Sequence, residues 1–539
     1  MLRLSFHGAA RTVTGSCFRL ETGHGQVLIN CGLFQGSKTE KELNYRPFPF
    51  SPQDIGAVIL SHAHIDHSGL LPKLVKAGFR GPIYATPAAT DLAGVMLPDS
   101  AHIQEIEVEQ LNKRNARRNL DPVEPIYGSA DAMACLEQFR PTPYATWFDV
   151  WPGVKARLWN AGHLLGSASV ELEVREPDGD RPLRLLFSGD IGPNFKLLQP
   201  DPDAPRDLDY VVCESTYGDT NRPDATAETR RRVLRDEVRA ARNPKGALLI
   251  PSFAVERAQE LISDLVQLMG EGELPIIPIY VDSPLATKAS RVFANHAADL
   301  DGGQNLVSGL SSRNVHFTET VEESKALDLL HEFHIVIAAS GMCDAGRIRH
   351  RLKNWLWRDE ATVLLVGYQA QGTLGRILQD GATSVRIQGE EFKVRARIRS
   401  IDLYSGHADG PELAAWISKR LPIANNLFLV HGEEPALAGL QARLRGIVEP
   451  KKIILPAIDE TFELTGSETL AMGAPVPPRI DRQKMAHLDW HNDVSRLILD
   501  INAALAAAAD EKTRAVVIRR LRRTLDDAVT GRGAARDAL

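Results

Sequence analysis

The feature that most constrains the fold is a cluster of three histidines and one aspartate within six residues. This segment, HAHIDH, directly follows the apolar run Ala57–Leu60, which is typical of a buried strand. Side chains two residues apart point the same way in an extended segment, so His62 and His64 can meet at one metal ion. Asp66 and His67 lie where the chain turns into the next helix, and they can reach a neighbouring ion. A lone histidine is more often a core or surface group, but this density predicts a metal site at a strand end.

Two further candidate ligands lie at the ends of expected elements in the same half of the chain. His163 stands in the segment NAGHLLGS, and Asp190 stands in FSGDIG, directly after an apolar strand. A carboxylate has two oxygens and can bridge two ions, and the neighbouring glycines let the backbone approach closely. Taken alone, the SGD segment would indicate only a turn capped by aspartate.

Composition narrows the class of protein. The chain has 539 residues, of which 43% are hydrophobic and 24% are charged, which is typical of a globular protein with more than one domain. No apolar run approaches the ~18 residues that cross a bilayer, and the start lacks a secretory pattern, so we expect a soluble cytoplasmic enzyme without a membrane partner. The five cysteines are far apart and lack CxxC spacing, which indicates neither a disulfide framework nor a thiolate zinc site.

Charge limits how the chain can meet a polyanion. The formal net charge of −6 argues against nonspecific coating of nucleic acid, because such binding needs a basic surface that displaces counterions. A polyanionic substrate would therefore have to be held by cations placed locally.

The element pattern changes along the chain. The first 210 residues show short β-rich runs between Gly and Pro turns, which indicates α/β or α+β layers. From about Thr226 to about residue 375, long helices alternate with fully apolar strands, which is typical of a parallel sheet. Strand candidates resume at Lys393–Ile398, Asn426–Val430 and Lys452–Leu455. Residues 480–531 have helical spacing, and we interpret them as a helical hairpin for packing or dimerisation.

The order of these motifs resembles the metallo-β-lactamase fold family, and in particular its β-CASP branch. HxHxDH, a later histidine and an aspartate after a strand resemble the metal-site motifs of that family. Glu214 in VCESTYG resembles motif A, His407 in SGHAD resembles motif B, and His431 in VHGE resembles motif C. The branch processes nucleic acids and includes the mRNA 3′-end cleavage factors and bacterial RNase J. The resemblance covers roughly residues 1–460.

The resemblance implies an α/β fold, an αββα metallo-β-lactamase sandwich with an inserted parallel-sheet β-CASP domain and a C-terminal helical extension. Residues 1–213 and 393–465 are expected to form the two parts of the sandwich. Residues 214–392 are expected to form the inserted domain, and residues 466–539 a linker and the helical extension.

The resemblance also implies two zinc ions at the rim of the sandwich. Its ligand set puts one ion on His62, His64 and His163, the other on Asp66, His67 and His431, with Asp190 bridging the two. Neutral imidazoles and carboxylates suit zinc. Two ions about 3.5 to 4 Å apart would bring the pKa of a bridging water near neutrality, and the bridging hydroxide is the expected nucleophile. The expected general acid is His407, oriented and kept charged by Glu214, and Asp66 completes the expected catalytic residues.

One position departs from the family pattern. Asn30, in LINCGLFQG, stands where the family normally has an aspartate that supports the metal ligands. An amide can accept a hydrogen bond from an imidazole N–H, but it adds no negative charge to the basicity of the ligand. We therefore expect weaker metal retention or lower activity, and an Asn30→Asp variant should gain zinc content or rate.

Substrate contacts are expected at three places. Ser340 and Gly341 follow an apolar strand, where backbone N–H groups can bind phosphate, although a structural turn is an equal alternative. Ser405 stands in motif B beside the expected general acid. Arg397 belongs to a row of cations on one face of a strand, with Lys393, Arg395 and Arg399. This row either follows an RNA backbone or guards an edge strand with charge.

We therefore expect a zinc-dependent ribonuclease that hydrolyses phosphodiester bonds of single-stranded RNA and that can form a homodimer through its C-terminal helices. A small-molecule metallo-hydrolase, lactonase-like or glyoxalase-like, would not need the interval of about 240 residues between Asp190 and His431. A DNA nuclease of the same family is an alternative, but its motif C position is usually apolar. A noncatalytic scaffold would be expected to lack metal ligands, and here all of the inferred ones are present. The sequence does not distinguish cutting within an RNA from cutting at its end.

Overall fold

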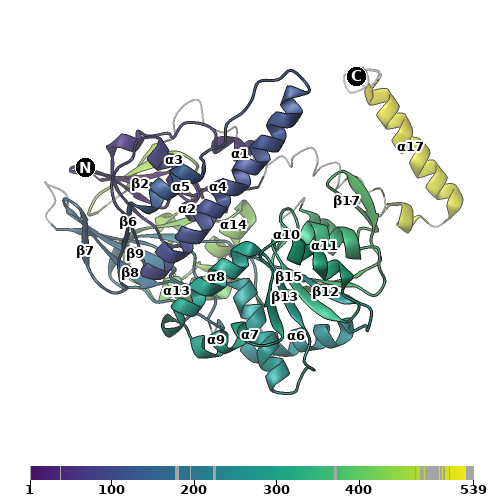
Figure 1. The fold of residues 1–539 in the computed structure, drawn as a ribbon. Helices are drawn as coiled ribbons and strands as arrows, with labels where there is room; N and C mark the ends of the chain where they lie inside the picture. The colour runs from purple at the N-terminus through teal and green to yellow at the C-terminus, as the bar shows by residue number, and fades with distance from the viewer. Residues whose placement is uncertain are drawn as a thin grey trace.

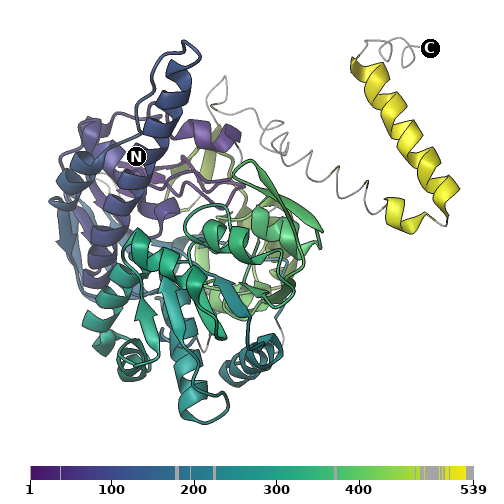
Figure 2. The same ribbon diagram turned by 45° about the vertical axis from the view of Figure 1, so that its right-hand side comes forward.

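The computed structural model describes most of the chain up to residue 473 and parts of the C-terminal stretch. The described residues are 2–36, 38–175, 181–194, 196–222, 226–369, 373–467, 469–473, 479, 497, 501, 504–508 and 510–529. Figures 1 and 2 show a β sandwich, a second α/β domain beside it, and a helix near the C-terminus that lies apart from both.

The first layer of the sandwich is a mixed sheet with the strand order β23-β22-β1-β2-β3-β4-β5-β6. Its strands are β1 Leu2–Phe6, β2 Phe18–Thr22, β3 Gly25–Ile29, β4 Ile55–Ile59, β5 Ile83–Ala85, β6 Phe139–Pro141, β22 Glu460–Leu464 and β23 Thr469–Gly473. β22 pairs antiparallel with β1, so the two distant ends of the first 473 residues meet in one sheet. The sandwich is therefore built from both sides of the inserted segment.

The second layer of the sandwich has the order β21-β20-β11-β10-β9-β8-β7. Its strands are β7 Phe148–Trp151, β8 Val154–Asn160, β9 Ala168–Val174, β10 Leu183–Phe187, β11 Leu208–Glu214, β20 Ile423–Val430 and β21 Ile453–Ile454. A buried cluster between the two sheets joins Phe6, Phe18 and Ile29 of the first to Phe187 and Phe428 of the second. Alternating apolar residues thus form the core where the layers face each other.

Helices cover the outer faces of both sheets. On the first sheet lie α2 Ile65–Ser68, α3 Leu71–Lys76, α4 Pro87–Ala116 and α5 Ser129–Leu136, and on the second lie α13 Gly410–Ser418 and α14 Glu434–Arg443. The short helix α1 Lys38–Leu43 packs through Leu43 against Phe34 and Ile458. The side chain of Thr86 accepts a hydrogen bond from the Ala89 N–H and so caps the start of the long α4. The layer order is α, β, β, α, which confirms the predicted sandwich.

The inserted domain is a six-stranded parallel sheet with the order β14-β13-β15-β12-β16-β19. Its strands are β12 Ala247–Pro251, β13 Ile279–Asp282, β14 Val315–Phe317, β15 His334–Ala338, β16 Thr362–Val366 and β19 Arg397–Ile401. Its helices are α6 Ala227–Ala241, α7 Arg257–Gly270, α8 Pro284–Asn295, α9 Gly303–Leu310, α10 Val321–Ala326, α11 Ile348–Trp355 and α12 Leu374–Gln379, with buried clusters on both faces of the sheet. The alternation of helices and apolar strands predicted this sheet correctly.

The strand expected at Lys393–Ile398 differs in both its bounds and its place. Lys393 ends β18 Glu390–Lys393, which forms a hairpin with β17 Ser384–Ile387, and β19 begins only at Arg397. β19 pairs with β16 at the edge of the inserted sheet, although residues from 393 onward were expected in the sandwich. The reason is packing, because Val394, Ala396 and Ile398 contact the core of the inserted domain.

Two expectations from composition concern cysteines and membrane spans. All five cysteines are free and buried, as expected of scattered reduced thiols. None of the helices among the described residues combines the length and apolar character needed to cross a membrane.

The C-terminal hairpin was expected over residues 480–531. Its second half corresponds to the helix α17 Glu511–Val529. Most of its first half, including Val494 and Ile498, lies outside the described residues.

Candidate active site

The seven candidate metal ligands come from loops and a short helix at one end of the sandwich. They follow β4 (His62, His64, Asp66, His67), β8 (His163), β10 (Asp190) and β20 (His431). Glycine permits one of these turns, because Gly189 has φ of +59° directly before Asp190. Strands distant in sequence thus bring their following residues to the same edge.

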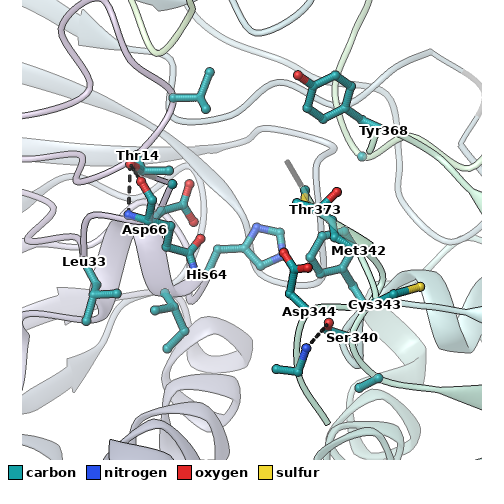
Figure 3. A pocket seen from close by; sticks show the side chains of 18 of the residues that line it. Thr14, Leu33, His64, Asp66, Ser340, Met342, Cys343, Asp344, Tyr368 and Thr373 are labelled. Atoms are coloured by element: carbon teal, nitrogen blue, oxygen red, sulfur yellow. Dashed lines mark hydrogen bonds between the residues drawn. The ribbon is translucent and has the colours of Figure 1, made fainter. Parts of the chain in front are cut away.

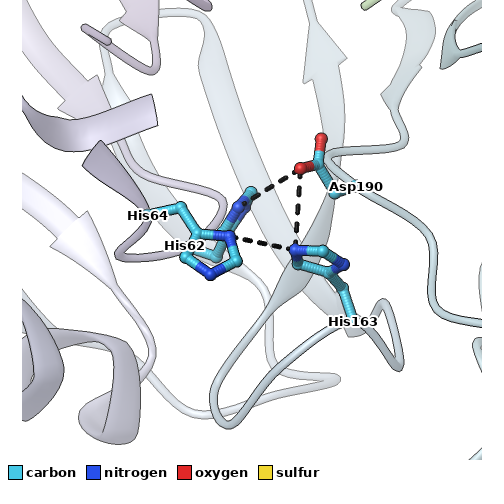
Figure 4. Close-up of side chains that lie close together, drawn as sticks. All are labelled: His62, His64, His163 and Asp190. Atoms are coloured by element: carbon cyan, nitrogen blue, oxygen red, sulfur yellow. Dashed lines mark hydrogen bonds and ion pairs between the residues drawn. The ribbon is translucent and has the colours of Figure 1, made fainter. Parts of the chain in front are cut away.

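The structure assembles these side chains into two groups that share Asp190. In each group the ligand atoms lie within 4.8 Å of one another: His62, His64, His163 and Asp190 form the first group, and Asp66, His67, His431 and Asp190 form the second. Figure 4 shows the side chains of the first group converging. This is the grouping that the resemblance implied.

The distances show how Asp190 is shared. Its Oδ2 lies 3.5 Å from His62 Nε2 and 3.6 Å from His163 Nε2. Its Oδ1 lies 3.2 Å from His67 Nε2 and 3.6 Å from His431 Nε2. One carboxylate oxygen therefore faces each group, as a bridging ligand requires.

The donor set fits metal ions. The Nε2 of His62 is buried without a hydrogen-bond partner, and such an orphaned polar atom is rare unless an ion or water completes it. His163 Nε2 also lies 3.0 Å from His64 Nδ1, so these two ring nitrogens are directed at the same place. Histidine nitrogens with carboxylate oxygens suit zinc and related transition metals.

Burial and charge set the protonation of the first group. Burial lowers the pKa of His64 to about 4 and holds the pKa of His62 and His163 well below the usual value. These three imidazoles are therefore neutral near pH 7, which is the form that binds metal. Burial opposes ionisation of Asp190, but the electrostatic interactions of its carboxylate with the imidazoles of His431, His67 and His62 outweigh it and hold the Asp190 pKa well below its usual value.

The second group carries more charge in the metal-free protein. Burial lowers the pKa of His431, but Asp190 and Asp66 outweigh it and raise that pKa to about 9. Binding of a metal there must displace a proton from His431.

A histidine and a glutamate lie beside the first group. The Nδ1 of His407 is 3.1 Å from Oε2 of Glu214 and 4.0 Å from Oδ2 of Asp190. Glu214 is buried, and Thr216 donates its hydroxyl hydrogen to Glu214 Oε2 at 2.5 Å. The pair predicted from motifs A and B is thus in contact and lies next to the ligand groups.

Contacts with the inserted domain fix the loop that carries His163, and they involve residues that no sequence motif indicated. Lys196 donates to the carbonyl of His163 and lies 3.1 Å from the carboxylate of Glu256. Glu256, just before α7, accepts a hydrogen bond from the Leu165 N–H at 3.1 Å. Gln199 donates to the same carboxylate. No local pattern links Glu256 to the others, because it lies far along the chain from Leu165, Lys196 and Gln199.

A cleft of about 2510 Å³ lies over the ligand groups, between the sandwich and the inserted domain. Figure 3 shows His64 and Asp66 on one side, and Ser340, Met342 and Tyr368 on the other. Its lining includes the aromatic residues Tyr45, Tyr217, Phe253 and Tyr368 and the cations Arg11, Lys41, Lys196, Arg257, Arg347, Arg349, Arg376 and Arg386. The cleft therefore combines aromatic rings with side chains of both charges, since its lining also includes carboxylates such as Asp219, Asp344 and Glu433.

The predicted substrate contacts divide into two sets. Ser340 and Ser405 line the cleft, and the Oγ of Ser405 accepts a hydrogen bond from the His407 N–H at 3.2 Å. Gly341 is not among the lining residues, and its carbonyl accepts from Gln369 at 3.1 Å. Arg397 is also outside the cleft.

The position of β19 explains why Arg397 is not brought to the site. β19 is an edge strand of the inserted sheet, and the guanidinium of Arg397 donates to the carbonyl of Ala240 at the end of α6. The neighbouring Arg399 pairs with Glu237 of the same helix at 2.5 Å. The alternative of an edge strand guarded by charge describes this row better than a path for RNA.

Family models match three consecutive parts of the chain. The metallo-beta-lactamase superfamily matches residues 10–252, the Beta-Casp domain matches residues 258–378, and the Zn-dependent metallo-hydrolase RNA specificity domain matches residues 391–456. The first match covers the first part of the sandwich and continues through α6 and β12 of the inserted domain, and the second covers the inserted domain from α7 to α12.

Curated relatives match over most of the chain. Ribonuclease TTHA0252 of Thermus thermophilus is 37% identical over 448 residues, which cover 81% of this chain and 95% of that protein. The RNase J-like protein of Methanocaldococcus jannaschii is 30% identical, with 80% of this chain and 93% of that protein covered. The transcription termination factor FttA of the same organism is 30% identical, with 80% and 67% covered. The chain therefore belongs to the β-CASP ribonuclease family of the metallo-β-lactamase superfamily and is a metal-dependent hydrolase.

Proposed function

We propose that this protein is a zinc-dependent ribonuclease that hydrolyses phosphodiester bonds of single-stranded RNA. The observation that carries the proposal is the pair of ligand groups sharing Asp190 at the cleft, with His407 and Glu214 beside them. Zinc bound by these groups would supply Lewis acidity, lowering the pKa of a coordinated water and neutralising charge on the phosphate.

His407 is the proposed proton donor to the departing 3′ oxygen. Its Nδ1 faces the carboxylate of Glu214, which orients the ring. The Thr216 hydroxyl, hydrogen-bonded to Glu214, fixes that carboxylate in turn. Asp66 is proposed to act as a ligand of the second group and so to be essential for the reaction.

The lining of the cleft favours an unpaired strand as the substrate. Aromatic rings such as Tyr217, Phe253 and Tyr368 can stack on exposed bases, and nearby arginines can contact phosphates. Ser340 and Ser405 line the same cleft and are proposed as further contacts. The chain as a whole carries a net charge of −6, and bound metal ions would add positive charge at the cleft. Binding away from the cleft should therefore be weak.

The proposal also covers the location and the oligomeric state of the protein. We propose that it acts in the cytoplasm and that it dimerises through the helical extension. α17 supports the second point, because Val516 and Ile518 on it are 37% and 41% exposed.

A cleavage assay on end-labelled RNA tests the proposed function. The zinc-loaded protein should cut a single-stranded RNA, and His64→Ala should lose at least about 100-fold in rate because a metal ligand is removed. His102→Ala is the matched control, because His102 is exposed on α4 and does not line the cleft. A DNA strand of the same sequence identifies a DNA nuclease if it is cut faster than the RNA. Equal RNA cleavage by wild type and His64→Ala would exclude the metal mechanism.

A further inference from the structure

The candidate metal-binding histidines differ in whether the ring nitrogen that points away from the ligand group faces a hydrogen-bond acceptor or a donor. A histidine that binds metal through one ring nitrogen carries its hydrogen on the other, and that hydrogen needs an acceptor. The partner of the outward nitrogen therefore shows whether a ring is prepared for a metal ion.

Three of the rings face acceptors. His163 presents Nδ1 to the carbonyl oxygen of Gly406 at 2.6 Å. His431 presents Nδ1 to the Thr216 hydroxyl at 3.0 Å, and that hydroxyl can accept because its own hydrogen goes to Glu214. His62 presents Nδ1 to the Ser61 hydroxyl at 3.0 Å. Each of these rings can keep its hydrogen on Nδ1 and leave Nε2 free for an ion.

His67 faces a donor instead. The Asn30 side chain is buried, and its Oδ1 accepts a hydrogen bond from the Ser61 N–H at 2.8 Å. A backbone N–H can only donate, so this contact fixes the orientation of the amide. The Nδ2 of Asn30 therefore faces His67 Nδ1 at 2.9 Å, and it also donates to the Ser16 hydroxyl at 3.2 Å.

This contact puts the hydrogen of His67 on the wrong nitrogen for metal binding. With Nδ1 accepting from the amide, the ring hydrogen lies on Nε2. That Nε2 is the atom directed at the second group, 3.2 Å from Asp190 and 3.1 Å from His431 Nε2. The Ser61 hydroxyl is 3.5 Å from His67 Nδ1 and lies closer to His62.

We propose that the two metal positions of this protein are unequal, and that the second group binds its ion about 10- to 100-fold more weakly than it would if Asn30 were an acceptor. An ion at the second group must either leave two donors facing each other at His67 or turn the amide of Asn30. Turning it would set the amide nitrogen against the Ser61 N–H. The first group has no such conflict at His62 or His163. The second ion is accordingly the exchangeable one.

This inference rests on the proposed zinc centre, and a binding experiment without RNA tests it. Metal-depleted full-length protein is titrated with zinc against a competing chromophoric chelator. Wild type should bind two ions in steps separated by at least about tenfold. Asn30→Asp should tighten the weaker step about 10- to 100-fold and leave the stronger step unchanged, because a carboxylate accepts from both Ser61 and His67.

Two further variants identify the steps. His431→Ala should abolish the weak step and keep the tight one, and this test does not depend on the folding of the Asn30 variant. Asn305→Asp adds the same charge on the exposed surface of α9 and should change neither step. Two equal steps in wild type, or loss of the tight step in His431→Ala, would overturn the inference. Equal tightening of both zinc-binding steps in Asn30→Asp would also overturn the inference, since the added negative charge alone would have that effect.

The result is separable from that of the RNA assay. Two unequal zinc steps without RNA cleavage would support the inference and contradict the proposed ribonuclease activity. RNA cleavage with two equal zinc-binding steps would support the proposed ribonuclease activity and contradict the inference. Absence of zinc binding in the titration would overturn both.

Discussion

His407 lies beside the two ligand groups, where the proposed function needs a proton donor. Its Nδ1 contacts Glu214 at 3.1 Å and lies 4.0 Å from the carboxylate shared by both ligand groups. The centroid of its ring is 4.6 Å from that of His163, so it borders the first group without belonging to that set of ligands. The proposed proton donation and the proposed metal binding therefore fall on different residues, and the two roles can be tested separately.

Replacing His407 should slow cleavage without loss of zinc. We expect His407→Ala to reduce the rate about 10²- to 10⁴-fold, the usual contribution of a general acid. Glu214→Gln should reduce it less, because the ring remains present but loses the charge that orients it. An RNA with sulfur in place of the bridging 3′ oxygen checks the role, because a thiolate leaves without a proton. If His407→Ala loses as much rate on that substrate as on normal RNA, His407 is not the proton donor.

At the scale of elements, the start of α7 connects the inserted domain to the metal centre. Glu256 adopts a φ of +70°, which is unusual for a residue other than glycine. Its buried carboxylate binds Lys196, Gln199 and the Leu165 N–H, all of them in loops of the sandwich. Since Lys196 and Leu165 flank the backbone of His163, this contact fixes a metal ligand from the other domain.

Loss of the Glu256 charge should destabilise the protein. Glu256→Gln leaves the ammonium of Lys196 without its carboxylate partner in a buried position, and removal of one partner of such a pair costs about 3 to 5 kcal/mol. Denaturant unfolding should report this loss, while Glu271→Gln, at the exposed end of α7, should change stability by less than about 0.5 kcal/mol. A loss below about 1 kcal/mol for Glu256→Gln would show that the pair does not hold the two domains together.

For the whole molecule, the two domains are joined at several points around the cleft. α4 of the sandwich packs against α8 of the inserted domain. His296, at the end of α8, lies 2.7 Å from Asp91 of α4 and 3.1 Å from Asp299. Burial opposes the charged form of His296, but the hydrogen bonds to the two aspartates outweigh it and raise its pKa above the usual value.

This contact should make stability depend on pH. Because the folded pKa of His296 is raised, its contribution is complete below the unfolded value of about 6.5 and is lost as the pH rises through the folded value. Both aspartates are largely exposed, so we expect only about 0.5 kcal/mol. Denaturant unfolding at about pH 5.5 and pH 8.5 should show that wild type loses this much more stability than His296→Gln. An identical pH dependence of the two proteins would contradict the contribution.

The parts of the molecule that could be predicted from the sequence are those that local residue patterns encode. The spacing of His62 and His64 after an apolar strand, and Asp190 after another, indicated which side chains could meet a metal ion. The alternation of helices and apolar strands indicated the parallel sheet. These signals work because the period of a strand and the ends of strands have fixed geometric consequences.

What sequence reasoning missed depends on packing between distant segments. The alternation of cationic and apolar residues along the strand indicated that the side chains of Arg397 and Arg399 share a face. It did not indicate that this face packs against α6. The ion pair between Glu256 and Lys196 joins residues about 60 positions apart, and no sequence motif includes both. The sequence singled out Asn30 as a departure, whereas the orientation of its amide follows only from the contact with the Ser61 N–H.

The most direct test of the account is zinc-dependent RNA cleavage by metal-depleted protein. Cleavage of a labelled single-stranded RNA is followed while zinc is added, with wild type and Asp190→Asn compared. Asp190 faces both ligand groups, so the variant should bind zinc poorly and lose at least about 100-fold in rate. Wild type should be inactive without metal and gain activity as zinc fills the two groups. Cleavage by the metal-free wild type, or an undiminished rate in Asp190→Asn, would contradict the proposed metal centre.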